Sequence, residues 1–78
     1  MPRYFFHFSD SQYHHDDVGT ECPSDDIAER QAMASAGAIV HELGPAFFGT
    51  RGWKMRVEEQ GGRHIVTLYM SGIAVHAI

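Results

Sequence analysis

Apolar side chains along this chain recur first at every second position, then at every third or fourth position, and finally at every second position again. Residues 3–8 carry aromatic side chains on both faces of an extended chain, a pattern typical of a central strand. The polar residues 9–17 lack apolar periodicity and predict a loop. Residues 18–22 predict a short second strand that pairs back on the first as a hairpin.

The clearest signal is that of a helix with one buried face over residues 25–43. Small and apolar residues recur along it at spacings of three and four positions: Ala28, Ala32, Ser35, Ile39 and Leu43. Polar residues 24–26 offer N-caps, and Gly44-Pro45 marks the end. The small side chains predict close packing on a sheet or on a symmetry-related helix. Gly37 either belongs to such a contact or is a tolerated surface glycine.

Two further strands follow the helix. Residues 45–52 predict a connector, and residues 53–58 alternate apolar and charged side chains, as in a strand with one face in water. Gln60-Gly61-Gly62 predicts a hairpin turn, after which residues 64–70 return as a strand that is apolar on both faces.

The predicted element order is β-β-α-β-β, a two-layer α+β domain with one helix packed on a four-stranded, mostly antiparallel sheet. The same order occurs in the β-grasp fold, in which the first and last strands pair in the centre. A chain of 78 residues is too short for two cores, so we expect residues 1–78 to form one domain. A core of this size contributes about 3–5 kcal/mol and commonly needs a disulfide, a metal or a second subunit.

A second subunit is the support we favour. Cys22 is the only cysteine, which excludes an internal disulfide and agrees with a reducing compartment. The apolar segment 72–78 predicts packing either on the core or on another subunit.

No apolar run approaches the roughly 20 residues that cross a bilayer, and the first residues lack the pattern of a signal peptide. We therefore expect a cytoplasmic protein without membrane contact.

Charge is divided unevenly between the two halves of the chain. The net charge is −4, but residues 1–50 carry eight acidic and two basic residues, whereas residues 51–78 carry two acidic and four basic ones. An acidic chain argues against nucleic acid as a partner. The aromatic residues of segment 53–57 also alternate inward and do not lie beside the bases on which they would need to stack. The basic residues predict a solubilising face or a surface for an acidic protein or a second subunit: Arg51, Lys54, Arg56 and Arg63.

The segment His14-His15-Asp16-Asp17 holds side chains that zinc and other divalent ions accept as ligands. Cys22 or His7 completes such a site if the hairpin folds back. A solvated loop is the competing interpretation, because adjacent side chains point in different directions and the spacing matches no established metal motif. The candidate ligands are His14, His15, Asp16 and Cys22.

Catalysis has weak support in this sequence. No nucleophile elbow, phosphate loop or dinucleotide fingerprint is present. A catalytic site would have to use Cys22 with a histidine as nucleophile and base, or Asp16 with Glu21 as acid and base. So short a chain also has little room for a pocket that excludes water. We expect a non-catalytic protein-interaction module that acts as a homodimer without a cofactor. The alternatives are a metal-binding sensor or metal-dependent enzyme, and a weak nucleic-acid binder that uses the basic strand.

Several short motifs resemble one family of proteins. The opening PRYFFH, the run Asp17-Val18-Gly19-Thr20-Glu21, the alanine-rich helix and the hairpin Trp53–Leu68 are similar to DUF6894, a family of short bacterial proteins of unknown function. The resemblance covers most of the chain and implies a bacterial, cytosolic origin. It brings no assigned activity, cofactor or catalytic residue. The loop before Asp17 is richer in histidine than the family pattern.

Overall fold

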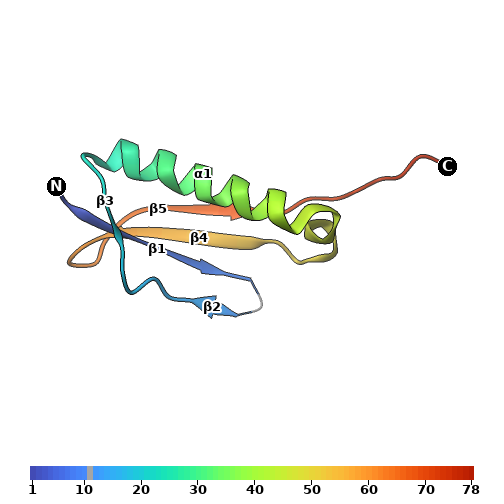
Figure 1. Ribbon diagram of the computed structural model, residues 1–78. Helices are drawn as coiled ribbons and strands as arrows, with labels where there is room; N and C mark the ends of the chain where they lie inside the picture. The colour runs from blue at the N-terminus through green and yellow to red at the C-terminus, as the bar shows by residue number, and fades with distance from the viewer. Residues whose placement is uncertain (11) are drawn as a thin grey trace.

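A single helix lies across one face of an antiparallel sheet in the computed structural model, which describes residues 1–10 and 12–78 (Figure 1). Residue 11, within the predicted loop 9–17, lies outside the described residues. The predicted α+β class and the order of strands and helix are confirmed, with one strand divided in two. The elements are β1 (Arg3–Ser9), β2 (Tyr13–His14), β3 (Thr20–Glu21), α1 (Asp25–Leu43), the 3-10 helix η1 (Gly44–Gly49), β4 (Trp53–Glu59) and β5 (Arg63–Met70).

The strand order in the sheet is β2-β1-β4-β5, with β3 also paired to β1, and every pairing is antiparallel. β1 is therefore central, as its aromatic residues on both faces predict. The β-grasp arrangement is wrong for this chain, because β5 lies at an edge and β1 pairs with β4. The tight turn at Gln60-Gly61-Gly62 makes β5 the neighbour of β4, and β1 occupies the other side of β4.

The strand predicted over residues 18–22 is shorter than expected, and a second piece, β2, lies in the predicted loop. The cause is the carboxylate of Asp16. Its Oδ1 accepts hydrogen bonds from the backbone N–H groups of Val18 and Gly19 at 3.0 Å each, which holds the chain in a turn. Its Oδ2 accepts a hydrogen bond from the N–H of Phe6 on β1 at 3.1 Å. The side chain thus takes the place of the backbone carbonyl that a paired strand would offer to this N–H.

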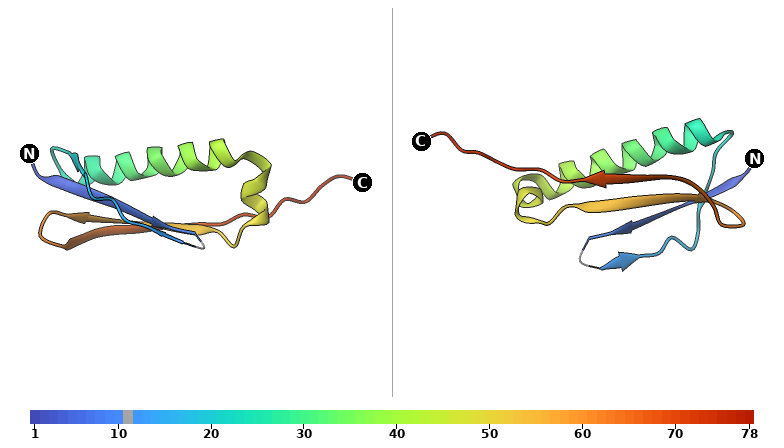
Figure 2. Two further views of the ribbon diagram at one scale, coloured as in Figure 1. Left: turned by 60° about the horizontal axis from the view of Figure 1, so that its bottom comes forward. Right: turned by 180° about the vertical axis from the view of Figure 1, so that it is seen from behind.

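Helix α1 has the predicted bounds and forms its own layer over the sheet (Figure 2). Ser24 is the N-cap, and its Oγ accepts a hydrogen bond from the N–H of Ile27 at 3.2 Å. The buried face consists of Ala28, Ala32 and Ala36, whereas Leu43, which we predicted in this stripe, is 40% exposed. These alanines face a core of larger side chains from the sheet and η1: Tyr4, Phe47, Trp53, Met55 and Val57.

The first turn of α1 is tied to the sheet through Asp25. Its Oδ1 accepts a hydrogen bond from the buried Tyr4 hydroxyl at 2.7 Å and another from Arg63 Nη2 at 2.8 Å. The Arg63 bond, followed by the Tyr4 bond, lowers the pKa of Asp25. The bond to this carboxylate raises the pKa of Tyr4 to about 12. Arg63 also donates to Glu59 at 2.8 Å, so one arginine joins the helix to the β4–β5 hairpin.

Gly19 is required where the Asp16 turn rejoins β1. Its φ is +76°, and a Cβ atom at this position would lie 2.9 Å from the carbonyl oxygen of Tyr4.

Replacement of Gly19 by alanine is expected to lower the free energy of unfolding by about 1–3 kcal/mol, because the turn must either hold a strained φ or move away from β1. Urea denaturation followed by circular dichroism measures this change. Gly49→Ala is the matched control, since Gly49 has open space around it and no positive φ. Equal denaturation midpoints for the two variants would contradict the assignment.

Candidate functional site

Helix α1 leaves the opposite side of the sheet uncovered, and we call this side the open face. The register of the strands defines its rows. Tyr13, Ser9, Lys54 and Tyr69 lie side by side on successive strands. In the next row His7 lies opposite Arg56, which lies opposite Thr67. The open face therefore carries these side chains: Phe5, His7, Ser9, Tyr13, His15, Lys54, Arg56, Glu58, Thr67 and Tyr69.

His7 is buried in this otherwise solvated face, with 2% of its surface exposed. The ring of His15 stacks on it with the centroids 4.3 Å apart, and Tyr13 lies beside it at 6.0 Å. Phe5 lies on the other side at 6.4 Å. The segment around β2 thus supplies the cover that the helix does not provide on this side of the sheet.

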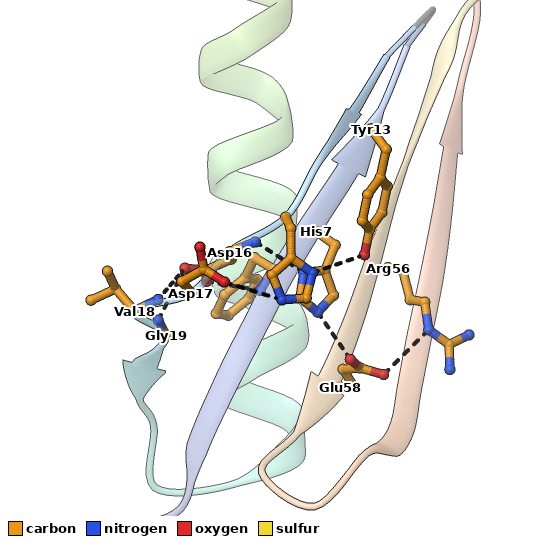
Figure 3. A network of polar contacts seen from close by, with 10 residues as sticks. His7, Tyr13, Asp16, Asp17, Val18, Gly19, Arg56 and Glu58 are labelled. Atoms are coloured by element: carbon orange, nitrogen blue, oxygen red, sulfur yellow. Dashed lines mark hydrogen bonds and ion pairs between the residues drawn. The ribbon is translucent and has the colours of Figure 1, made fainter.

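Both ring nitrogens of His7 are engaged (Figure 3). The backbone N–H of Asp16 donates to Nδ1 at 3.0 Å, and Nε2 lies 2.9 Å from Oε1 of Glu58. Because a backbone N–H can only donate, Nδ1 carries a lone pair, and the neutral ring holds its proton on Nε2 and donates it to Glu58. Glu58 also accepts from Arg56 Nε at 3.4 Å.

The two carboxylates of this network have lowered pKa values. The hydrogen bond from His7 is the main cause for Glu58, and Arg56 adds to it. Burial would raise the pKa of Asp16, but hydrogen bonds from the N–H groups of Gly19, Phe6 and Val18 together outweigh it. Both groups therefore stabilise the fold as anions. Chemically, the network attaches the β2 segment to the sheet and leaves neither nitrogen of His7 free for a substrate.

The four candidate metal ligands lie in different surroundings. His14 stacks on Phe8 with the ring centroids 4.2 Å apart, whereas His15 stacks on His7 on the opposite face. The carboxylate of Asp16 is occupied by three backbone N–H groups. Cys22 is buried in the core. In residues 1–10 and 12–78 no three His, Cys, Asp or Glu side chains are grouped so that they could hold a metal ion.

The four basic residues predicted as one interaction surface are also separated. Arg63 lies at the hairpin end and binds Asp25 and Glu59. Arg56 pairs with Glu58. Arg51 and Lys54 make no ion pair within the described part of the chain. They line a cleft of about 400 Å³ at the other end of the sheet, together with Tyr69.

A second surface runs along the free edge of β5, and sequence analysis did not find it. A groove of about 530 Å³ lies between this strand and α1. Met33, which is 61% exposed, and Gly37 line it from the helix, and Leu68 and Tyr69 line it from the strand. The nearest signal in the sequence was that residues 64–70 are apolar on both faces. We call this surface the β5 groove.

Within the predicted apolar segment 72–78, Gly72 contacts the core but residues 73–78 do not pack on it, so that alternative is wrong for them. Gly72 runs against the rings of Phe47 and Phe48, where a Cβ atom would lie 2.8 Å from Phe48. Beyond it the chain leaves the sheet (Figure 1), with Ile73 86% and Val75 89% exposed.

The fold and these surfaces define a small α+β domain with one helix on an open antiparallel sheet. The sequence profile of a domain of unknown function, DUF6894, matches residues 3–71, and the chain belongs to this family. No curated protein and no solved structure matches the chain. Among the described residues, no helix has the length and apolar character needed to cross a membrane.

Asp16→Asn is expected to lower the free energy of unfolding at pH 7 by about 1–3 kcal/mol, because one of its two accepting oxygens becomes a donor that faces backbone N–H groups. A carboxylate with a lowered pKa stabilises the fold above its unfolded pKa and loses this effect as the pH falls through the folded pKa. The difference between wild type and variant should therefore shrink below the ordinary aspartate value of 3.8. Urea titrations between pH 7 and pH 3 measure it. Asp17→Asn, at a carboxylate 85% exposed, is the control, and an equal loss there would contradict the role of Asp16.

Proposed function

We propose that this protein is a non-catalytic interaction module that forms a homodimer by antiparallel pairing of β5 with β5 of a second copy. The observation that carries the proposal is the free edge of an eight-residue strand beside the β5 groove. An unpaired edge presents a row of N–H and C=O groups to any strand that fits it.

The two edges of the sheet are built differently. On the β1 side, the Asp16 turn interrupts the edge and leaves only two-residue strands, a usual way to prevent pairing with other chains. Residues 66–70 of β5 hold no proline, no charge and no bulge; the register shift of this strand lies before them, where Val57 pairs with Val66 and Glu58 with His64. This asymmetry supports β5 as the edge that another chain occupies.

Gly37 supports the groove as a packing surface. A glycine inside a helix costs up to about 1 kcal/mol relative to alanine. A Cβ atom at Gly37 would meet nothing within 4 Å, so the fold of a single copy does not require glycine there. Close approach of a second helix across the paired β5 strands would require it.

The register of the pairing follows from the faces of β5. A two-fold axis at Thr67 places Leu68 of one copy opposite Val66 of the other, and both lie on the helix side. This arrangement continues the sheet through both copies and brings the two grooves together. The small core and the exposed apolar segment 73–78 also favour a second subunit.

The alternative functions have less support. Metal sensing or metal-dependent catalysis would use residues that are already engaged in stacking, capping and the core. General acid–base catalysis by His7 would require a free nitrogen, and both are bonded.

Met33→Lys is expected to weaken the dimer by at least about tenfold, because it places a charge in the contact between the two grooves. Sedimentation velocity over a concentration series measures the dissociation constant. Ala34→Lys is the matched control, since Ala34 is an exposed neighbour on the same helix that does not line the groove. A wild-type protein that stays monomeric at hundreds of micromolar would overturn the proposal, as would equal effects of the two lysines.

Gly37→Ala separates the two interpretations of this glycine. The alanine should stabilise the monomer by up to about 1 kcal/mol through helix propensity, and it should weaken the dimer by crowding the helix contact. Thermal unfolding at low concentration and sedimentation at high concentration measure these two effects. A more stable monomer with an unchanged dimer would show that α1 does not pack against its copy.

A further inference from the structure

We infer that the open face is a binding site for single-stranded nucleic acid, with phosphates at Arg51 and Lys54 and bases stacked on Tyr69 and Tyr13. This site lies on the face of the sheet opposite α1, shares Tyr69 with the β5 groove, and does not require a second copy. It uses the face of the sheet that α1 leaves uncovered.

Aromatic rings flank the cations on this face. Tyr69 is 77% exposed and Tyr13 is 61% exposed, and they come from strands on either side of the sheet. The register places Ser9 and Lys54 between them, in a row of about 14 Å at the usual strand spacing. Exposed rings beside cations are what single strands use, because every base can stack on a ring.

The charges on this face are available to a ligand only in part. Glu58 is engaged by His7 and Arg56, and Asp17 lies 3.3 Å from His15. Lys54 and Arg51 have no carboxylate partner in the part of the chain that the structure describes. The open face therefore offers positive charge although the whole chain carries −4.

Much of the negative charge lies elsewhere. Asp25 and Asp26 lie in the first turn of α1, in the other layer, and Asp25 is engaged by Arg63. Asp10 does line the cleft, and its Oδ1 accepts a hydrogen bond from the N–H of Gln12 at 2.7 Å and lies 3.6 Å from His14.

The cleft beside Tyr69 gives the site its anchor. Its volume of about 400 Å³ is within the range of ligand pockets, and Ser9, Ser71, Arg51 and Lys54 line it with Tyr69. One phosphate and one base match this combination of cations, hydroxyls and ring. An acidic peptide would pair with the cations but would leave the two tyrosine rings without a stacking partner. A duplex offers no exposed base faces for these rings.

The test uses the full chain and two fluorescein-labelled 12-mers, oligo-U RNA and oligo-dT DNA, with a labelled 12-mer of glutamate as the competing polyanion. Fluorescence anisotropy measures binding over a salt series. The two phosphate contacts at Arg51 and Lys54 predict a slope of log K against log salt of about −1.4, with about 0.7 lost in Lys54→Gln. Tyr69→Ser should weaken binding by about tenfold, and Tyr69→Phe should retain it because the ring remains.

Arg30→Gln is the matched charge control, since Arg30 is an exposed arginine on the helix. Sedimentation of each variant shows whether the dimer persists, so a loss of binding is not confused with a loss of association. Binding of either oligonucleotide with these effects, and without an effect of Arg30→Gln, is the expected result. No binding at low salt, equal binding of the glutamate peptide, or insensitivity to Tyr69→Ser would each overturn the inference.

Discussion

One helix cannot cover both faces of a sheet, and the rest of this structure follows from that constraint. The alanines at 28, 32 and 36 bring α1 close to β4 and β5, and the large side chains of the core come from the sheet and η1. This packing uses the apolar residues of one face only. It leaves an open face on the far side and a free edge at β5 (Figure 2). Both proposed surfaces are regions that the single helix does not cover.

The side-chain network around Asp16 compensates for the missing second layer at one place. By bonding to Phe6 on β1 and to the turn at Val18 and Gly19, Asp16 fixes the path of the chain along β1. The same path brings the rings of Tyr13 and His15 over His7. The Asp16 carboxylate thus interrupts one edge of the sheet and holds the segment that buries His7. Within the described residues, no side chain interrupts the edge of β5 in this way.

The elements that could be predicted from sequence are those that local patterns specify. The helix bounds follow from caps and spacing, and the β4–β5 hairpin follows from alternation and Gln60-Gly61-Gly62. The division of the second strand could not be predicted, because it depends on a side chain that bonds to a residue ten positions earlier. The pairing of the first and last strands, predicted by analogy with the β-grasp fold, is wrong, because the order of elements along the chain does not determine the order of strands in the sheet.

The structure separates the candidate site residues for a related reason. Adjacent histidines that look like one cluster point to opposite faces once β2 pairs with β1. Arg63 binds Asp25, 38 positions earlier in the chain, and does not line the cleft with Arg51 and Lys54. Conversely, the sequence of segment 53–57 does not predict the aromatic residues beside Lys54. Tyr13 and Tyr69 come from other strands, and only the strand register places them in the same row as Lys54.

The free edge of β5 can be observed directly by amide hydrogen exchange, measured residue by residue at low and at high protein concentration. The account predicts that the β5 amides not bonded to β4 exchange rapidly in dilute protein and become protected as concentration rises, while the amides around Asp16 do not change. If those β5 amides are equally protected at every concentration, the account is contradicted.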